Sequence, residues 1–496
     1  MTTDRRSMSR LGRDTMLYGI GTVLTRMVSF IMLPVYTRYL TPADYGLLQI
    51  LDLALEVASI LISAGATAGI MRFYFKADTE QQRRNVLFTG WITQVALNLA
   101  GTALLMLVAP LIWHYGLSEA GTVGLVRIAA CNFTLGTIMF VPTLMLQADQ
   151  RPLAYISTSV SKLILQLSLN ILFLVGFHWG PRGVLLSTFT ANLAIGLVMS
   201  AILLRRTGIS WSWPTFRDLR RFAVPTQFSR GGAFILAYGD RFFLEKLHGL
   251  GSVGVYGLAY QFGFLISGTI AGPFMQAWSP QRWQLVNEPP AVRDARMNRG
   301  FLFGDLIIIT AAVGIALFIR PIIRVMTTPE FHSAAVMVPV ILLAYVFQVW
   351  NTIVDFGISV SERIRYTSLS TWISVVVVLV LYSTLIPRYA GMGAAVATLI
   401  AVVVRFFCTL HWAQRLWRIE YRWVLHVRML VAGTAIASAS FLLTPTGLLP
   451  LIGVGLAGFA LYVGFVWNAV LEPSDRALAL KFIRNPRALP ALIIGG

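Results

Sequence analysis

The chain has 496 residues, of which 56% are hydrophobic and only 12% are charged. Soluble globular domains carry about 25% charged residues, so these proportions exclude an ordinary soluble protein and predict one embedded in a membrane. The formal net charge is +19, but the basic residues stand in small groups between apolar blocks, without the basic stripe of a nucleic-acid-binding protein. We therefore expect membrane lipids, and no nucleic acid, as partners.

Apolar blocks follow one another along the chain, each close to the roughly 20 residues with which a helix crosses a bilayer. They predict an all-α polytopic membrane protein with about fourteen transmembrane helices. The first block is longer than the apolar region of a cleavable signal, so we expect it to be retained. The predicted helices, in chain order, are 14–37, 44–71, 85–113, 120–147, 153–177, 183–204, 218–243, 252–280, 299–319, 333–360, 366–387, 391–414, 424–443 and 448–470.

The charge of the connecting segments predicts the orientation of these helices. If the odd-numbered helices run outward, the cytoplasmic segments hold 28 of the 40 basic residues and the opposite segments hold seven. Basic residues concentrate on the cytoplasmic side of membrane proteins. The sequence therefore predicts that both termini are cytoplasmic.

A weak internal repeat relates the first six helices to the next six. Residues 25–32 resemble residues 229–236, and Tyr155-Ile156-Ser157 resembles Tyr366-Thr367-Ser368; Asp44-Tyr45-Gly46 has a counterpart in Val253-Gly254. Six is even, so both copies enter the membrane in the same direction, as in transporters built from parallel repeats. We expect two pseudo-symmetric six-helix bundles, with two further helices at the carboxyl end: 1–205, 206–415 and 416–496.

Several stretches of sequence resemble one family. Residues 33–46, Leu33-Pro-Val-Tyr-Thr-Arg-Tyr-Leu-Thr-Pro-Ala-Asp-Tyr-Gly46, are similar to the N-terminal signature of the polysaccharide transporter family. These are the Wzx-type O-antigen and exopolysaccharide flippases of the multidrug/oligosaccharidyl-lipid/polysaccharide (MOP) superfamily. The resemblance extends over residues 10–415 and includes three further stretches: Leu146-Gln-Ala-Asp-Gln-Arg-Pro152, Tyr238-Gly-Asp-Arg-Phe-Phe-Leu244 and Val253-Gly-Val-Tyr256.

This resemblance implies a fold of MATE type, a central cavity and alternating access. It also implies a substrate, undecaprenyl-pyrophosphate-linked oligosaccharide, and a location in the bacterial inner membrane, with a polymerase and other polysaccharide-assembly proteins as possible partners. Two alternatives stay open: a MATE-like exporter of drugs or other small molecules, and a membrane-embedded polysaccharide polymerase or ligase. The short external loops favour a transporter over an enzyme. We expect no catalytic residue, no metal site and no cofactor.

Arginines inside the apolar blocks are candidates for binding an anionic substrate, because a buried charge is costly and is usually functional. Arg26 lies about 18 Å into the first helix at 1.5 Å per residue, and Arg230 lies equally far into the seventh. A guanidinium suits phosphate oxygens, although a carboxylate on a neighbouring helix would also account for each arginine. Arg405 is a further candidate, and Arg127 is close enough to the outer end of its helix to reach the surface.

Acidic residues inside the helices are candidates for ion coupling. Asp52 and Glu56 lie four residues apart, hence on one helix face, and Glu56 lies at the depth of Arg26. A proton-coupling site and a plain salt bridge between helices both explain them. Asp305 and Asp355 are further candidates, with pairing to Arg299 or Arg363 as the structural alternative.

The remaining candidates concern a gate and a polar cavity lining. Asp240 and Arg241 end the seventh predicted helix near the outer surface and suggest an outer gate. Uncharged polar residues within the helices suit sugar hydroxyls, and equally suit hydrogen bonds between helices: Gln147, Asn170, Gln261, Gln348 and Asn351.

Overall fold

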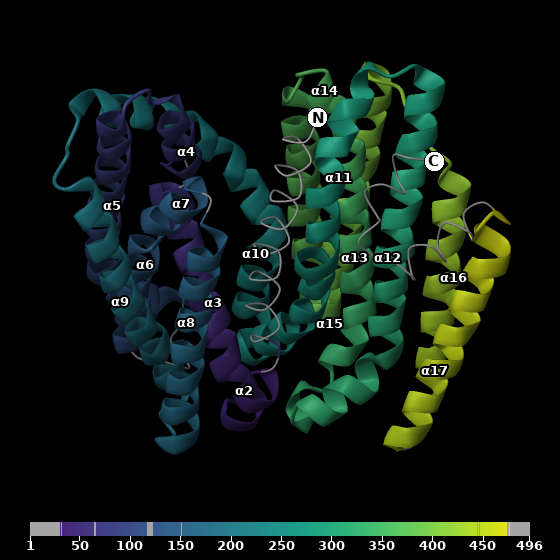
Figure 1. Cartoon of the computed structure of the whole chain (residues 1–496). Coiled ribbons are helices and arrows are strands. Elements are labelled where there is room, and N and C mark those ends of the chain that lie inside the picture. Colours follow the sequence, from purple (N-terminus) through teal and green to yellow (C-terminus); the bar gives the residue numbers. More distant parts are fainter. Residues whose placement is uncertain are drawn as a thin grey trace. The chain divides into compact units, whose positions relative to one another are not determined.

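The computed structural model confirms an all-α protein (Figure 1). Throughout the residues that it describes, every regular element is a helix and no strand occurs. The described residues are 30, 32–63, 66–116, 123–149, 151–443, 445, 447–473 and 476.

The chain divides into two compact units, Met1–Gly254 and Val255–Gly496. The first unit contains the amino-terminal helices and most of α10. Its elements are α2 (Leu33–Tyr39), α3 (Pro42–Ser63), α4 (Ala66–Lys76), α5 (Glu80–Gly116), α6 (Val123–Ile138), α7 (Phe140–Ala148), α8 (Pro152–Asn170), the π-helical turn η1 (Ile171–Gly176), α9 (Gly180–Thr207) and α10 (Trp213–Leu265).

The second unit takes the end of α10 and all that follows. Its elements are η2 (Ile266–Ala271), α11 (Gly272–Gln284), η3 (Leu285–Asn287), α12 (Pro290–Met326), η4 (Pro329–Phe331), α13 (Ala334–Val354), α14 (Phe356–Val360), α15 (Arg365–Leu416), α16 (Trp423–Leu442), α17 (Leu448–Phe465) and η5 (Val466–Val470). The lobe boundaries expected from the sequence repeat stay a prediction.

Two of these helices are broken inside, at the places where the sequence predicts loops. Gly249 has φ +75° within α10, and Ala390 has φ +46° within α15. A positive φ interrupts the helical hydrogen-bond ladder and is readily adopted by glycine. Residues 213–248 and 250–265 are therefore separate helices, as are residues 365–389 and 391–416.

Ten helices within the described ranges are long and apolar enough to cross a membrane, and two of the ten contain these breaks. Each predicted helix from residue 44 onward has a helical counterpart. Most of the first predicted helix, 14–37, lies outside the described residues. The structure is compatible with fourteen spans.

The predicted boundaries differ most where helices extend beyond the apolar blocks. The polar stretch from Gln281 to Arg299, expected as a loop, is largely helical: α11 continues to Gln284 and α12 begins at Pro290. Proline is well suited to the first turn of a helix. Charged residues end the apolar block without ending the helix, because the backbone hydrogen bonds continue outside the bilayer.

In unit 1, the main packing contacts join α5 with α6, α6 with α9 and α8 with α9. Small polar side chains connect the first of these pairs: Thr102 Oγ1 donates to the carbonyl oxygen of Ala130 at 2.9 Å, and Thr134 Oγ1 donates to that of Asn98 at 3.0 Å. Such hydrogen bonds hold helices together where lipid removes the hydrophobic driving force.

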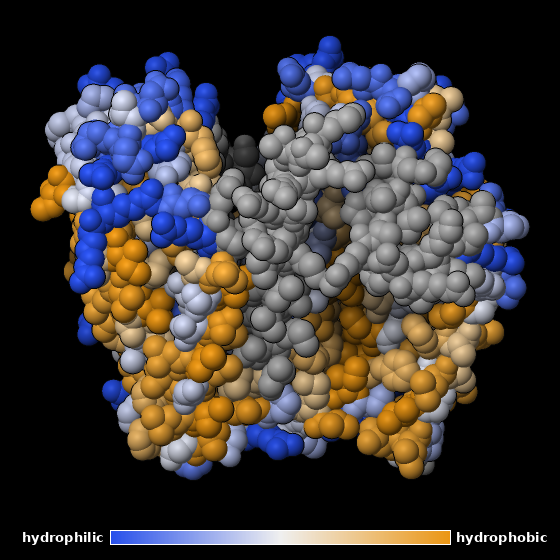
Figure 2. Space-filling model, viewed as in Figure 1, coloured by the Kyte–Doolittle hydropathy of each residue, from blue (hydrophilic) through white to orange (hydrophobic). Residues whose placement is uncertain are grey.

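The surface of unit 1, on the left in Figure 2, has a broad hydrophobic band beneath a hydrophilic end. Large apolar side chains such as Leu104, Leu107 and Leu197 are exposed on its helices. Contiguous exposed apolar surface of this kind marks contact with a membrane. The protein is therefore a multi-pass membrane protein.

Candidate functional site

The start of α3 shows what part of the Leu33–Gly46 motif does structurally. Thr41 precedes the helix, Pro42 is its first residue, and Asp44 Oδ2 accepts hydrogen bonds from Thr41 N at 3.1 Å and Thr41 Oγ1 at 2.8 Å. In return, Thr41 Oγ1 accepts from Asp44 N at 3.1 Å. This reciprocal arrangement is a capping box, which fixes where the helix begins.

Two glycines of the family-like motifs lie against one another in unit 1. A Cβ on Gly46 would be 1.9 Å from the carbonyl oxygen of Leu250, and a Cβ on Gly254 would be 2.0 Å from that of Pro42. Both obstacles are backbone atoms, which cannot move aside as a side chain can. The start of α3 and the second segment of α10 therefore approach more closely than any residue larger than glycine allows.

Asp52 and Glu56 are both exposed side chains of α3, four residues apart and therefore on one face of the helix. Neither forms a salt bridge among the described residues. Two exposed carboxylates on a mostly apolar helix are available to a solute or an ion. Their role in ion coupling stays a prediction.

The arginines expected to bind substrate are only partly described. Arg26 lies outside the described residues, and Arg230 is described as a backbone position of α10 only. Arg127 of α6 is exposed. A phosphate-binding role for these residues therefore stays a prediction.

Arg405 belongs to a polar cluster in unit 2 that also contains Arg282 and Asp355. It is half-buried on α15, and its Nε has no hydrogen-bond partner within the described residues. Asp355, at the junction of α13 and α14, interacts electrostatically with both Arg405 and Arg282. Its Oδ1 accepts a hydrogen bond of 2.6 Å from Thr367 Oγ1.

Arg282 of α11 is a buried member of this cluster that sequence reasoning missed. Its guanidinium carbon is 4.9 Å from the centre of the Trp278 ring and 4.6 Å from that of Phe356. Its Nη1 donates to the carbonyl oxygen of Ile353 at 3.3 Å. The spacing of Trp278 and Arg282, one helical turn apart, was the signal that the sequence offered. The second aromatic partner of Arg282, Phe356 of α14, is 74 positions away in the chain.

Asp305 of α12 is completely buried, and its partner is His426 of α16 and not Arg299. His426 Nδ1 lies 2.7 Å from Asp305 Oδ2, and Trp350 Nε1 of α13 donates to both carboxylate oxygens at 2.9 Å. The imidazole of His426 stacks on Phe301 with ring centres 3.9 Å apart. The sequence offered no signal for His426, since it is 121 residues from Asp305.

Asp149, within the family-like stretch 146–152, is the centre of a second polar cluster that sequence reasoning missed. It follows α7 and forms a salt bridge with Arg206 at the end of α9. Its Oδ1 also accepts a 2.9 Å hydrogen bond from the hydroxyl of Tyr74 on α4. One carboxylate thus joins three elements of unit 1 at the ends of their helices.

Asp240 and Arg241 lie within a continuous helical segment and not at a helix end. Both are buried, and Arg241 Nη1 is 3.1 Å from Asp240 Oδ1. The segment of α10 continues five residues beyond the end expected at 243. The expectation of an outer gate at this pair stays a prediction.

The uncharged polar residues have different surroundings. Asn170 is buried, with Nδ2 donating to the Tyr36 hydroxyl at 2.9 Å and Oδ1 accepting from Ser187 Oγ at 2.6 Å, so it connects α8 with α2 and α9. Asn351 is buried, whereas Gln348 is exposed. Gln147 and Gln261 are half-buried.

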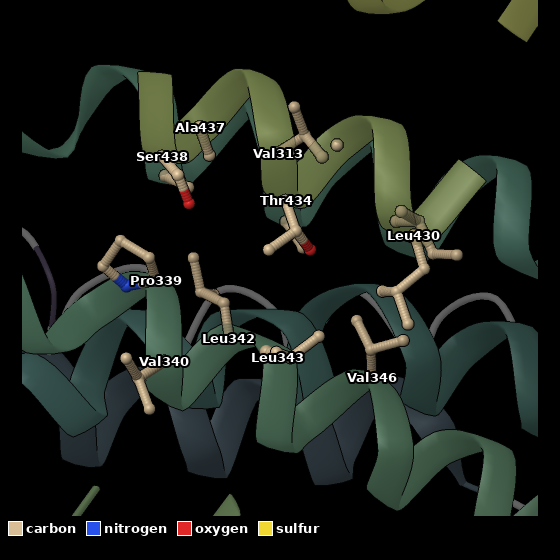
Figure 3. Close-up of a pocket in the computed structure, with 14 residues that line it drawn as sticks. Val313, Pro339, Val340, Leu342, Leu343, Val346, Leu430, Thr434, Ala437 and Ser438 are labelled. Atoms are coloured by element: carbon tan, nitrogen blue, oxygen red, sulfur yellow. The ribbon is translucent and has the colours of Figure 1, made fainter. Parts of the chain in front are cut away.

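Cavities occur within each unit. In unit 1 a cavity of about 160 Å³ lies among α3, α5, α6 and α10, with Glu245 as its charged lining residue. In unit 2 a cavity of about 140 Å³ lies between α12, α13 and α16 (Figure 3). Throughout the described ranges, no three His, Cys, Asp or Glu side chains gather as metal ligands would.

The sequence itself assigns the family. Residues 11–284, more than half of the chain, match the family described as polysaccharide biosynthesis protein. The chain therefore belongs to this family, which confirms the family expected from the motifs. No curated protein matches the sequence.

Solved structures show the same fold at low sequence identity. The lipid II flippase MurJ in an inward closed conformation has a TM-score of 0.71 at 13% identity, covering 92% of this chain and 100% of its own. A multidrug resistance MATE family transporter of the MOP superfamily, inward-facing, has a TM-score of 0.61 at 14% identity, with 80% and 97% covered. A MOP superfamily transporter from Pyrococcus furiosus has a TM-score of 0.59 at 14% identity, with 82% and 95% covered. The chain therefore shares its fold with these flippase and transporter structures.

Proposed function

We propose that this protein is a flippase that carries undecaprenyl-pyrophosphate-linked oligosaccharide from the cytoplasmic to the outer leaflet of a bacterial inner membrane, by alternating access. The observation that carries the proposal is the family of polysaccharide biosynthesis proteins combined with a fold that covers the whole length of a lipid II flippase. A chain that takes part in polysaccharide synthesis and has the fold of a lipid transporter is best explained by the transport of a lipid-linked saccharide.

The charges of the chain support an anionic substrate. Arg26 and Arg230 occupy equivalent places in the sequence repeat, and a pair of guanidinium groups at mid-membrane depth suits the oxygens of a diphosphate. Alternation between two orientations would expose this diphosphate site to one leaflet at a time. The product would then serve a polymerase for O-antigen, capsule or exopolysaccharide.

The decisive experiment replaces Arg26 and Arg230 with alanine. Each variant should reduce surface polysaccharide at least about tenfold, as expected when about 1.4 kcal/mol of substrate binding is lost, while its level in the membrane stays normal. Arg388→Ala removes an exposed arginine and serves as the control. Normal surface polysaccharide in both Arg26→Ala and Arg230→Ala would refute phosphate binding by these residues.

A MATE-like exporter is the second candidate, favoured by one observation. The exposed carboxylates of Asp52 and Glu56 would suit a cationic solute better than a diphosphate. A drug exporter should protect cells from cationic dyes and lose this protection in Asp52→Asn, whereas a flippase should leave dye sensitivity unchanged. The transporters and flippase named above give no support to a polymerase or ligase.

A further inference from the structure

The buried contact between Asp305 and His426 has an incomplete set of hydrogen bonds. Asp305 is 0% exposed and His426 is 1% exposed. Both oxygens of the carboxylate accept hydrogen bonds from Trp350, and one also contacts His426 Nδ1. On the other side of the imidazole, Nε2 is buried and has no hydrogen-bond partner among the described residues.

The charge of this pair depends on a single proton. If His426 is neutral, with its hydrogen on Nδ1, and Asp305 is ionised, the pair carries one uncompensated negative charge in a buried site. If Nε2 also holds a proton, the imidazolium neutralises the carboxylate. An uncompensated buried charge is strongly unfavourable, so the buried arrangement favours the protonated pair.

No other cation compensates Asp305 in the part of unit 2 that the structure describes. The surrounding rings are apolar: Phe301 stacks on the imidazole, and Trp423 and Phe406 pack edge to face nearby. The titratable neighbours are Tyr462 of α17, which interacts electrostatically with Asp305, and Tyr421, which contacts Phe301. Neither tyrosine supplies a positive charge.

The pair lies between the two ends of a contact that joins the parallel helices α12 and α16. At one end of this contact, Asn298 of α12 accepts a 2.7 Å hydrogen bond from the backbone N–H of Arg422 and donates one of 2.7 Å to the carbonyl oxygen of Glu420. At the other end, Arg320 of α12 donates to the carbonyl oxygens of Phe441 at 2.7 Å and Leu443 at 3.0 Å. Asp305 and His426 are the titratable link between these two anchors.

A cavity begins one helical turn beyond the pair. Ile309 and Leu430, each four residues on from Asp305 and His426, line its near end, and four residues on is the next turn of the same helix face. Figure 3 shows the side chains of Thr434 and Ser438 on the α16 side of this space. Its volume of about 140 Å³ is large enough for water, which needs about 10–15 Å³ of such space.

We propose that Asp305 and His426 form a proton-binding site, at which His426 Nε2 takes up one proton when α16 closes on α12 and releases it to water when the two helices separate. The proposal rests on the transport function above and adds the coupled ion to it. The negative charge left after release requires hydration, which the closed contact excludes. Proton release and separation of the helices therefore accompany one another.

The first test measures the protonation of His426 directly. The full chain is prepared in lipid nanodiscs with isotope-labelled histidine, and the ring resonances, assigned by their loss in His426→Gln, are followed with pH. We expect a single-proton titration of His426. In Asp305→Asn the pH dependence of these resonances should change, because the ring loses its carboxylate partner. A ring that keeps one protonation state wherever the protein stays folded would overturn the proposal.

The second test measures how the transport of undecaprenyl-pyrophosphate-linked oligosaccharide across the membrane of liposomes depends on pH. The rate for the unmodified protein should change by up to about tenfold per pH unit, the limit for one proton, and this dependence should be lost in Asp305→Asn and in His426→Gln. His411→Gln changes an exposed histidine of the same unit and should keep the dependence. If Asp305→Asn does not fold, His426→Gln and the titration of the unmodified protein carry the test.

The two proposals fail in different ways. The titration requires no substrate, so an intact His426 titration without movement of lipid-linked saccharide contradicts the substrate and leaves the proton site supported. Conversely, if the saccharide is transported and neither Asp305→Asn nor His426→Gln changes the pH profile, proton coupling at this site is refuted and the flippase function stays supported.

Discussion

At the scale of single residues, the partner of a carboxylate decides its role. Asp149 lies at the ends of helices, where Arg206 and Tyr74 bind it at the edge of the apolar region. Asp305 lies among aromatic rings, and within the described ranges a histidine is the only group that balances its charge. Asp52 is exposed on an apolar helix. The same side chain is thus a structural link, a proposed proton site and a candidate for contact with a solute.

The link at Asp149 predicts a loss of stability on substitution. Asp149→Asn should lower the free energy of unfolding by about 2 kcal/mol, the size of a hydrogen bond to a charged group, because the negative charge is lost and one of the two acceptor oxygens used by Arg206 and Tyr74 becomes a donor. Thermal unfolding in detergent measures this change. Combining it with Arg206→Gln should cost less than the sum of the single effects.

The control for this prediction is Asp218→Asn, which changes an exposed aspartate of the same unit. Such a surface substitution usually alters stability by no more than about 0.5 kcal/mol. Equal effects of the two substitutions, or additive effects of Asp149→Asn and Arg206→Gln, would show that the cluster contributes nothing specific.

At the scale of helices, backbone contacts determine where segments begin and how closely they approach. The capping box of Thr41 and Asp44 starts α3, and the pair Gly46 and Gly254 allows its first turn to lie against α10. Both features fall within stretches that resemble the polysaccharide transporter family. Part of that resemblance therefore reflects packing requirements and not substrate contacts.

This contact predicts a severe effect of a single methyl group. Gly46→Ala and Gly254→Ala should each destabilise unit 1 by about 3 kcal/mol or more, at the upper end of overpacking effects, because the obstructing atoms belong to the backbone. The measurement is the yield and melting temperature of the purified protein.

Gly453→Ala is the matched control for the two glycine variants. A Cβ at Gly453 meets nothing within 4 Å, although this glycine also lies inside a helix, α17. Alanine there should raise stability by about 0.5–1 kcal/mol, since it restricts the unfolded chain. Normal folding of Gly46→Ala and Gly254→Ala would show that the two segments do not lie this close.

At the scale of the whole molecule, hydropathy and charge describe the membrane embedding. The aligned contacts of α12 with α16, from Asn298 with Arg422 to Arg320 with Leu443, show that these helices run parallel. They correspond to the ninth and thirteenth predicted helices. Both numbers are odd, so the predicted topology requires the two helices to cross the membrane in the same direction, which agrees with their parallel packing.

The orientation predicted from basic residues can be checked by labelling single cysteines. After Cys131 and Cys408 are replaced, Asp78→Cys, between α4 and α5, should react with an impermeant thiol reagent only in opened cells. Glu330→Cys, between α12 and α13, should react in intact cells. The expected sides follow from the concentration of basic residues in cytoplasmic segments. Reversed labelling of these two positions would contradict the predicted orientation.

The sequence by itself determined the membrane class, the helical segments and the family, because apolar block length, loop charge and short motifs are properties of neighbouring residues. The residues at which helices begin and end were harder to predict from the sequence, because helices such as α12 continue past their apolar block. Only the tertiary structure decided which groups are partners: Asp305 with His426, Arg282 with Phe356, and Gly46 with Leu250 and Gly254. These contacts join residues from 74 to more than 200 positions apart in the chain, and folding brings them together through packing that no local pattern of hydropathy or charge encodes.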